Sequence, residues 1–436
     1  MSVEPDAAVA ATADAGHVPV TLSRDTALAI LALFPLAFIV FGVAVDGPLA
    51  VGRGLLAIVT SRDTLITDYI GLGGLGAAFV NAGLLTLIAV LIYRQCDAVI
   101  GGAAVACLFL VLGFALFGKS LLNVWPTVAG VWLYARYQGE PFARHINTAF
   151  FGTALAPLFS EILFSSKLPL AVSLPLALAT ALTIGFVLAP VAAQLFKAHM
   201  GYSLYNMGFA AGIVGVVVVA LYKSYGFVPD PVFIWTTGNN LLLGLALGSM
   251  FAAMVAGGFR LDKQAFAGQR GLMRLAGQSP TDFVALAGLG PALLNMGLTG
   301  GIGMAYVLAI GGALNGPTIG AILTIVGFSA FGKTPRNILP VMAGVVLGSI
   351  AKPWNIDDPG VQLAALFGTT LAPIAGRFGW RWGLVAGFLH SSVVQTVGAL
   401  HGGLVLYNNG FAAGLVASVL APVILALRAP EAADKT

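Results

Sequence analysis

The chain has 436 residues, of which 58% are hydrophobic and only 9% are charged, and its mean hydropathy is +0.95. Soluble domains carry about 25% charged residues, so this composition excludes a soluble enzyme, a nucleic-acid-binding protein and a disordered chain. The net charge is +4, and the 56 glycines and 22 prolines indicate closely packed helices with irregular breaks. We therefore expect an integral membrane protein whose main partner is the lipid bilayer.

Residues 1–25 are polar and lack the basic start, apolar stretch and cleavage site of a signal peptide, so we expect a loose tail. Seven apolar stretches follow, at 26–46, 70–93, 98–118, 120–136, 146–164, 169–196 and 203–222. After a loop at 223–236, seven more lie at 237–258, 282–306, 308–331, 335–351, 360–376, 382–399 and 404–427, before a tail at 428–436. A helix needs about 20 apolar residues to cross a bilayer. The chain is thus expected to be all-α with about 14 transmembrane helices, some of them short or broken.

The second half of the chain repeats the first half in order. Asn81-Ala-Gly-Leu matches Asn295-Met-Gly-Leu, and Gly113-Phe-Ala-Leu-Phe-Gly-Lys-Ser matches Gly327-Phe-Ser-Ala-Phe-Gly-Lys-Thr, both at an offset of 214 residues. Further on, Leu-Tyr-Asn-x-Gly-Phe-Ala-Ala-Gly occurs around Asn206 and again around Asn408. The repeat predicts two homologous membrane units, a first unit at 26–222 and a second unit at 237–427.

The basic residues indicate how the two units are oriented. Seven crossings per unit invert the second unit, and with the N-terminus inside they place 13 basic residues on the cytoplasmic side and 5 on the other. This distribution follows the positive-inside rule. A re-entrant fourth segment would instead make the units parallel and place the basic loop at 260–274 outside. We therefore predict inverted-topology repeats of seven in a bacterial inner (plasma) membrane, with both termini in the cytoplasm.

Inverted repeats are common in secondary transporters, where the solute site lies between the repeats. The string at 113–120 and 327–334 matches a phosphate-binding P-loop, but its place at the end of an apolar helix argues against a nucleotide site. Lys119 and Lys333 would instead sit beside helix N-termini capped by Ser120 and Thr334, where backbone N–H groups favour anions. The alternative is an interfacial lysine that pins a tight hairpin. The matched residues Asn123 and Asn337 follow these lysines.

Asn-x-Gly occurs four times within apolar segments, at Asn81, Asn206, Asn295 and Asn408. Asn followed by Gly allows a local break that would turn backbone groups toward a solute. The alternative is a hydrogen bond to a neighbouring helix across a small-residue contact. Tyr205 and Tyr407 precede two of these asparagines, and we place the asparagines and tyrosines along a polar path.

Two Phe-Gly-Thr-x-Leu-Ala-Pro segments contain Thr153 and Thr369. Their prolines should kink the helix, and the threonine should satisfy the freed carbonyl, so a structural role is favoured over solute binding. Asp68 and Asp282 lie at segment starts, where helix capping explains them at least as well as ion coordination.

Three polar residues that the repeat does not conserve are candidates for ion or proton coupling. Glu161 aligns with Arg377. The two residues would either pair across the repeat axis or mark opposite faces of the membrane. His390 and Gln395 lie in the sixth segment of the second unit, where His390 is able to titrate near neutral pH or to serve as a packing residue. The sequence contains no HExxH motif and no cysteine metal pattern. We therefore expect no catalytic residues, no metal and no cofactor.

The doubled Leu-Tyr-Asn-x-Gly-Phe-Ala-Ala-Gly and Phe-Gly-Lys-x-x-x-Asn-x-x-Pro segments resemble those of a bacterial membrane protein family of unknown function with a duplicated domain, here covering about 26–425. The Tyr-Asn pairs also show a weaker similarity to urea transporters. That family conducts a small neutral solute through two inverted halves as an oligomer, so the similarity implies a homodimer or homotrimer.

The sequence therefore predicts membrane transport of a small polar solute or anion through a site between two inverted repeats, with proton or ion coupling as one alternative. A passive pore for a small neutral solute, like a urea channel, is a second hypothesis. An intramembrane enzyme is a third hypothesis, although the sequence lacks the clustered acid–base residues that such an enzyme needs.

Overall fold

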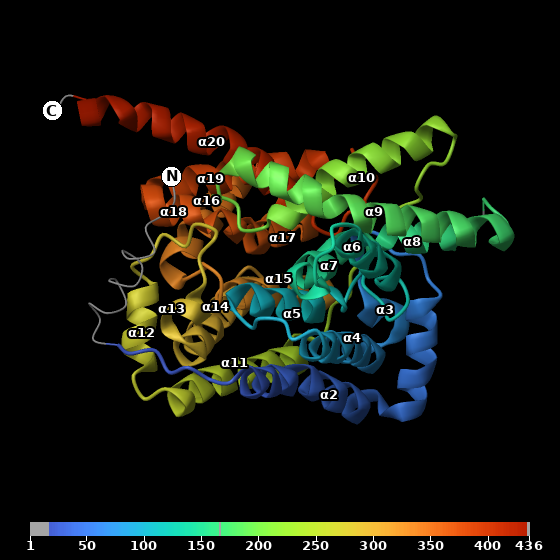
Figure 1. The fold of residues 1–436 in the computed structure, drawn as a ribbon, viewed down its shortest axis with the longest axis horizontal. Helices are drawn as coiled ribbons and strands as arrows, with labels where there is room; N and C mark the ends of the chain where they lie inside the picture. The colour runs from blue at the N-terminus through green and yellow to red at the C-terminus, as the bar shows by residue number, and fades with distance from the viewer. Residues whose placement is uncertain (1–16, 165–166, 434–436) are drawn as a thin grey trace.

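The computed structural model describes residues 17–164 and 167–433, which fold almost entirely into α-helices (Figure 1). The first unit contains α2 (Arg24–Val59), α3 (Tyr69–Gly73), α4 (Leu75–Gln95), α5 (Gly102–Phe114), α6 (Trp125–Tyr137), α7 (Ile146–Gly152), α8 (Ala156–Leu163), α9 (Leu170–His199) and α10 (Asn206–Ser224). The second unit contains α11 (Asn240–Leu261), α12 (Ala265–Leu272), α13 (Phe283–Ala287), α14 (Leu289–Ala309), α15 (Gly316–Phe328), α16 (Pro335–Ala351), α17 (Pro359–Gly368), α18 (Ala372–Phe378), α19 (Trp380–Val397) and α20 (Asn408–Ala433).

Three short 3-10 helices and two short strands complete the described structure. The 3-10 helices are Phe142–Arg144, Thr153–Leu155 and Thr369–Leu371. The strands β1 (Ile66–Thr67) and β2 (Phe233–Ile234) pair in parallel, with Ile66 opposite Phe233. This pairing ties the linker after α2 to the linker between the two units, and the sequence does not predict it.

The two units pack in the same way internally and cross each other at two places. α2 packs on α4 as α11 packs on α14, and α6 packs on α9 as α16 packs on α19. Between the units, α5 packs on α15 and α10 packs on α20. In Figure 1, α2 and α11 run in opposite directions, and α10 and α20 extend from the centre toward opposite ends of the molecule. These two pairs of corresponding helices therefore run in opposite directions in this view.

Within the described residues, eight helical segments are long and apolar enough to cross a membrane. They are α2, α4, Ile146–Leu163, α9, α10, α11, α14 and Asn408–Arg428 of α20. α5, α15 and α16 are apolar but shorter, and α6 has 13 residues. Fourteen full crossings are thus not confirmed. Short and broken helices are present, because 3-10 turns separate α7 from α8 and α17 from α18.

The ends of the chain differ from the predicted tails. Residues 1–16 and 434–436 lie outside the described residues. His17 is buried, with its Nε2 2.7 Å from Asp262 Oδ2, so the segment before α2 packs on the second unit. α2 bends at Gly47 (φ 75°), which ends the predicted 26–46 segment and starts a second helical arm. α20 continues to Ala433 and so includes part of the predicted C-terminal tail.

Asp68 and Asp282 cap helices, as predicted, and each also contacts the other unit. Asp68 Oδ1 accepts a hydrogen bond from Ile70 N in α3 (3.0 Å) and from Gly316 N at the start of α15 (3.1 Å). Asp282 Oδ1 accepts from Ala285 N (2.9 Å) and from Gly102 N at the start of α5 (2.8 Å). The exchanged caps fix α5 and α15, the two central short helices, against each other.

Glycines allow the units to approach closely at both crossings. A Cβ on Gly208 would lie 2.8 Å from the Cα of Gly410, where α10 crosses α20. A Cβ on Gly113 would lie 3.0 Å from the Cα of Gly320, where α5 crosses α15. Small residues are the usual means of close helix contact in apolar surroundings. The loops after α5 and α15 are thereby held near the middle of the molecule.

Candidate functional site

Two buried lysines reach from each unit to the other. Lys119 follows α5 and Lys333 follows α15, and both side chains are fully buried. Lys119 Nζ donates a hydrogen bond to the hydroxyl of Tyr407 (2.5 Å). Lys333 Nζ donates to the hydroxyl of Tyr205 and to Thr369 Oγ1, the latter at 2.8 Å. Their burial excludes the alternative of interfacial lysines that snorkel toward water.

Aromatic rings surround both ammonium groups. Lys119 Nζ lies 4.8 Å from the ring centre of Tyr407 and 5.3 Å from that of Phe114, and Lys333 Nζ lies 4.5 Å from Tyr205 and 5.5 Å from Phe328. Such distances give favourable cation–π contacts. We call the six residues Phe114, Lys119, Tyr205, Phe328, Lys333 and Tyr407 the central cluster.

Asn81 and Asn295 hold the loops that carry the lysines. Asn81 Nδ2 donates to the carbonyls of Ala115 (2.7 Å) and Lys119 (2.9 Å). Asn295 Nδ2 donates to the carbonyls of Ser329 (2.8 Å) and Lys333 (2.7 Å). α4 and α14 continue without interruption through these residues, so the predicted helix break is wrong at both. Neither amide lies on the walls of the cavities described below.

Asn123 and Asn337 form a second set of loop contacts. Asn123 Oδ1 accepts from Ser120 N, and Asn337 Oδ1 accepts from Thr334 N, each at 2.8 Å. Thr334 precedes Pro335 at the start of α16, as predicted. α6 begins only at Trp125, so the prediction that Ser120 caps a helix is wrong.

Asn206 and Asn408 stand at the first positions of α10 and α20, where the chain leaves the preceding helix. Asn206 Nδ2 donates to Ala192 O (3.0 Å), and Asn408 Nδ2 donates to Val394 O (3.1 Å). Their Oδ1 atoms lie 2.9 Å from Nε2 of His199 and His401, respectively. The chain is therefore non-helical before each of these asparagines, and both amides are tied to the helix that precedes the break.

Thr153 and Thr369 lie at the 3-10 breaks. Thr153 Oγ1 donates to Phe150 O (2.6 Å), and Thr369 Oγ1 donates to Leu366 O (2.5 Å). The carbonyls that the prolines free are those of Thr153 and Thr369 themselves, and they accept from Ala156 N and Ala372 N, so the prediction that the threonine side chain satisfies the freed carbonyl is wrong. Thr369 also contacts Lys333 and so belongs to the surroundings of the central cluster.

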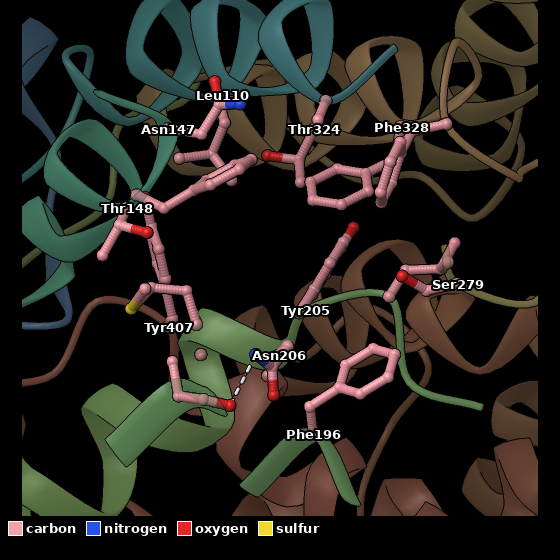
Figure 2. A pocket seen from close by; sticks show the side chains of 18 of the residues that line it. Leu110, Asn147, Thr148, Phe196, Tyr205, Asn206, Ser279, Thr324, Phe328 and Tyr407 are labelled. Atoms are coloured by element: carbon pink, nitrogen blue, oxygen red, sulfur yellow. Dashed lines mark hydrogen bonds between the residues drawn. The ribbon is translucent and has the colours of Figure 1, made fainter. Parts of the chain in front are cut away.

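A cavity of about 340 Å³ opens between the units, and we call it cavity A (Figure 2). Tyr205, Tyr407 and Phe328 of the central cluster lie on its wall. Figure 2 shows the side chains of Asn147, Thr148, Asn206, Ser279 and Thr324 arranged around the same space. Cavity A is thus mainly apolar, with a few amide and hydroxyl groups.

A smaller cavity of about 150 Å³, cavity B, lies on the other side of a shared wall made by Phe367, Leu406 and Asn409. All residues lining cavity B, except Ile66 and Gly360, are repeat counterparts of residues lining cavity A. For example, Gln395 and Asn408 of cavity B correspond to Ala193 and Asn206 of cavity A. The two cavities are therefore the same feature of the fold, which occurs twice, and both units contribute to the wall of each cavity.

The coupling candidates lie apart from one another. Glu161 is buried, with Oε1 3.8 Å from Arg62 Nη1, and this contact lies within the first unit. Arg377 is exposed, and pairing of Glu161 with Arg377 across the repeat axis is wrong. His390 is buried, with Nε2 3.1 Å from Asn409 Oδ1 on the shared wall, whereas Gln395 lies on the wall of cavity B.

The family model described as "Protein of unknown function (DUF1576)" matches residues 48–224 and 261–426. The chain belongs to the DUF1576 family. The two matched regions agree with the predicted duplicated domain. No curated protein and no solved structure matches the chain, so nothing among these comparisons links it to urea transporters.

Several polar residues of this DUF1576 protein were missed by the sequence analysis. Asn147, Thr148, Ser279 and Asn409 line cavity A. Asn409 follows Asn408 in a motif that had been noticed, whereas Ser279 has leucine as its repeat counterpart and gave no repeat signal. Across residues 17–164 and 167–433, no group of three His, Cys, Asp or Glu side chains is placed to hold a metal ion.

Proposed function

We propose that this DUF1576 protein transports a small polar solute or a small anion across a bacterial inner membrane. The path runs from cavity A, past the central cluster, to cavity B. One observation carries the proposal: cavities A and B are repeat counterparts on opposite sides of a shared wall. Secondary transporters built from inverted repeats use such a pair of half-paths alternately.

The unequal volumes support alternating access over a permanently open pore. Cavity A has about 340 Å³ and cavity B about 150 Å³, although the two are built from matched residues. We infer a second conformation of the protein in which cavity B is the larger and cavity A the smaller. It arises because each unit is able to adopt the conformation that the other unit has in this structure. With the N-terminus inside, α9 ends and α19 begins at the cytoplasmic side. Ala193 near the end of α9 then places cavity A toward the cytoplasm.

The lining of the path suggests the solute class. Cavity A falls at the lower end of the volumes of small-molecule sites, which are about 300–1,000 Å³. Its wall combines apolar side chains with the amides and hydroxyls of Asn147, Thr148 and Ser279. The two lysine Nζ groups of the central cluster are hydrogen-bond donors, and they favour a solute with a carbonyl or carboxylate oxygen.

A passive pore for a small neutral solute is the second candidate function. Both lysine Nζ atoms already donate to tyrosine hydroxyls. In this function, amide and hydroxyl groups of the path would therefore bind the neutral solute, and the lysines would not. Homo-oligomer formation is part of the same proposal, as is the orientation with cytoplasmic termini.

Flux measurements in proteoliposomes test the proposed function. Entry of urea, acetamide, formate, acetate and phosphate would be followed by light scattering after an osmotic step. We expect at least one of these solutes to enter vesicles that contain the protein faster than protein-free vesicles. A rate that changes with an imposed pH gradient indicates coupling, and a rate that does not change favours the passive pore. Equal rates with and without protein for all five solutes would contradict transport of this solute class.

A further inference from the structure

A buried pair of carboxyl groups lies behind the lysine loop of the first unit. Asp63, in the linker between α2 and β1, is 0% exposed, and Glu161 in α8 is 1% exposed. Asn123 Nδ2 donates to Asp63 Oδ2 at 3.0 Å and to Gly118 O at 3.1 Å. Gly118 directly precedes Lys119 in the chain. One amide group therefore links the Asp63 carboxyl to the backbone of the lysine loop.

Three buried oxygens at this place lack hydrogen-bond partners. Among the described residues, Asp63 Oδ1, Glu161 Oε2 and the hydroxyl oxygen of Tyr69 are buried and make no hydrogen bond of standard geometry. Buried polar atoms are nearly always satisfied, and an exception needs an explanation. A buried carboxylate with a free oxygen, under the influence of a second buried carboxylate, is explained most simply by a bound proton or cation.

The basic side chains near Asp63 do not balance the negative charge of its carboxylate. Arg62 Nη1 lies 3.8 Å from Glu161 Oε1 and 3.3 Å from Asp230 Oδ2, so one guanidinium serves two other carboxylates. Lys167 also acts on Glu161. The groups that approach Asp63 are the neutral side chains of Asn123, Ser160 and Tyr69, together with the like charge of Glu161.

The surroundings shift the proton affinity of Asp63, which lies outside the membrane-spanning helices. Burial, with a smaller contribution from Glu161, raises the pKa of the Asp63 carboxyl from 3.8 to about 7. The hydrogen bond from Asn123 and the nearby hydroxyl groups of Ser160 and Tyr69 act in the opposite direction and lower this pKa. A carboxyl group in these surroundings changes its charge near neutral pH.

The second unit shows that the fold does not need this carboxyl group. The repeat counterparts of Asp63, Tyr69, Ser160 and Glu161 are Gly277, Phe283, Gly376 and Arg377. Asn337 nevertheless bonds Gly332 O at 2.9 Å, as its counterpart Asn123 bonds Gly118 O. A Cβ at Gly277 would lie 1.9 Å from Gly332 O, so no side chain fits there. The carboxyl site is an addition to one unit only.

We propose that Asp63 binds and releases one proton, and that Asn123 transmits its charge state to the lysine loop of the first unit. The inference rests on the proposed transport function, to which it adds proton coupling at a site present in one unit. When protonated, Asp63 is neutral and its second oxygen is able to donate to a neighbouring oxygen. When ionised, Asp63 attracts the side-chain amide of Asn123 more strongly, and this amide also donates to Gly118 O in the lysine loop.

The pH dependence of thermal unfolding tests the proton site without any solute. The pKa of Asp63 is higher in the folded protein than in the unfolded chain, so the folded state binds the extra proton between these two pKa values. Tm of the purified protein in detergent should therefore fall from about pH 5 to about pH 8. We expect Asp63→Asn to remove most of this fall. The matched control Asp230→Asn, at an exposed carboxyl beside Arg62, should keep it.

A second measurement needs no variant at the carboxyl pair. The infrared spectrum of the wild-type protein should show a protonated carboxyl band that disappears as the pH rises through about 7. The absence of this band, or an unchanged fall in Tm in Asp63→Asn, would overturn the proton site. A rise in Tm when sodium chloride replaces choline chloride, lost in Asp63→Asn, would assign the charge to sodium and overturn the proton. None of these results depends on whether a solute crosses the membrane.

Discussion

Replacing Lys333 by methionine should lower solute flux by at least about tenfold, equivalent to about 1.4 kcal/mol in the barrier. The Lys333 amine donates to Tyr205 and Thr369 at the centre of the proposed path. Methionine is similar in length and flexible, so it fills the same space without the charge. Among the described residues Lys333 forms no ion pair, so an apolar side chain of similar volume removes the cost of burying an unpaired amine. The loss should therefore appear in flux, measured in proteoliposomes with a solute that the wild-type protein admits.

Two further variants separate a role in the path from a general lysine effect. Lys119→Met should reduce flux similarly, because Lys119 is the repeat counterpart of Lys333 and contacts Tyr407. Lys352→Met is the control: Lys352 Nζ bonds Phe388 O (2.8 Å) and Ser391 Oγ (2.7 Å) but lies away from the central cluster. Wild-type flux in both Lys119→Met and Lys333→Met would show that the lysines have only a structural role.

Replacing Asn295 by alanine should destabilise the fold by about 2–6 kcal/mol, because two buried carbonyls lose their donor at about 1–3 kcal/mol each. These are the carbonyls of Ser329 and Lys333, at 2.8 and 2.7 Å from Asn295 Nδ2. Thermal unfolding in detergent measures the effect as a lower Tm, accompanied by a lower yield of folded protein.

Asn355→Ala is the matched control for Asn295. The side chain of Asn355 is exposed, and its hydrogen bond to Asp358 comes from the backbone, which alanine retains. Its free energy of unfolding should change by no more than about 0.5 kcal/mol. If Asn295→Ala unfolds at the wild-type temperature, the contacts of Asn295 do not stabilise the lysine loop.

The repeat could be predicted from the sequence, and so could the matched positions of the two lysine loops, but the contacts of these loops could not. Lys119 and Tyr407 are 288 residues apart, and each belongs to a motif that the repeat highlights. Nothing in either motif indicates that the lysine of one unit meets the tyrosine of the other. That pairing depends on how α5 crosses α15 and how α10 crosses α20.

Asn81 illustrates why local patterns misled the prediction of broken helices. Its side chain bonds the loop after α5 instead of its own helix, so α4 remains regular. Gly83, which follows it, serves close packing, since a Cβ there would lie 2.6 Å from Pro35 O in α2. The fourteen predicted crossings are not confirmed for a similar reason. α5 is apolar and almost completely buried, and hydropathy alone does not distinguish such a core helix from a membrane span.

The sidedness of cavities A and B tests the account most directly. Ala193 and Gln395 are repeat counterparts, both exposed, and they line cavity A and cavity B, respectively. Each would be replaced by cysteine in a protein whose natural cysteines have been changed by Cys96→Ser and Cys107→Ala. A membrane-impermeant thiol reagent is then applied to intact cells and to inside-out vesicles. We predict that Ala193→Cys reacts from the cytoplasmic side only and Gln395→Cys from the opposite side only. Labelling of both cysteines from the same side would contradict a path between two inverted units.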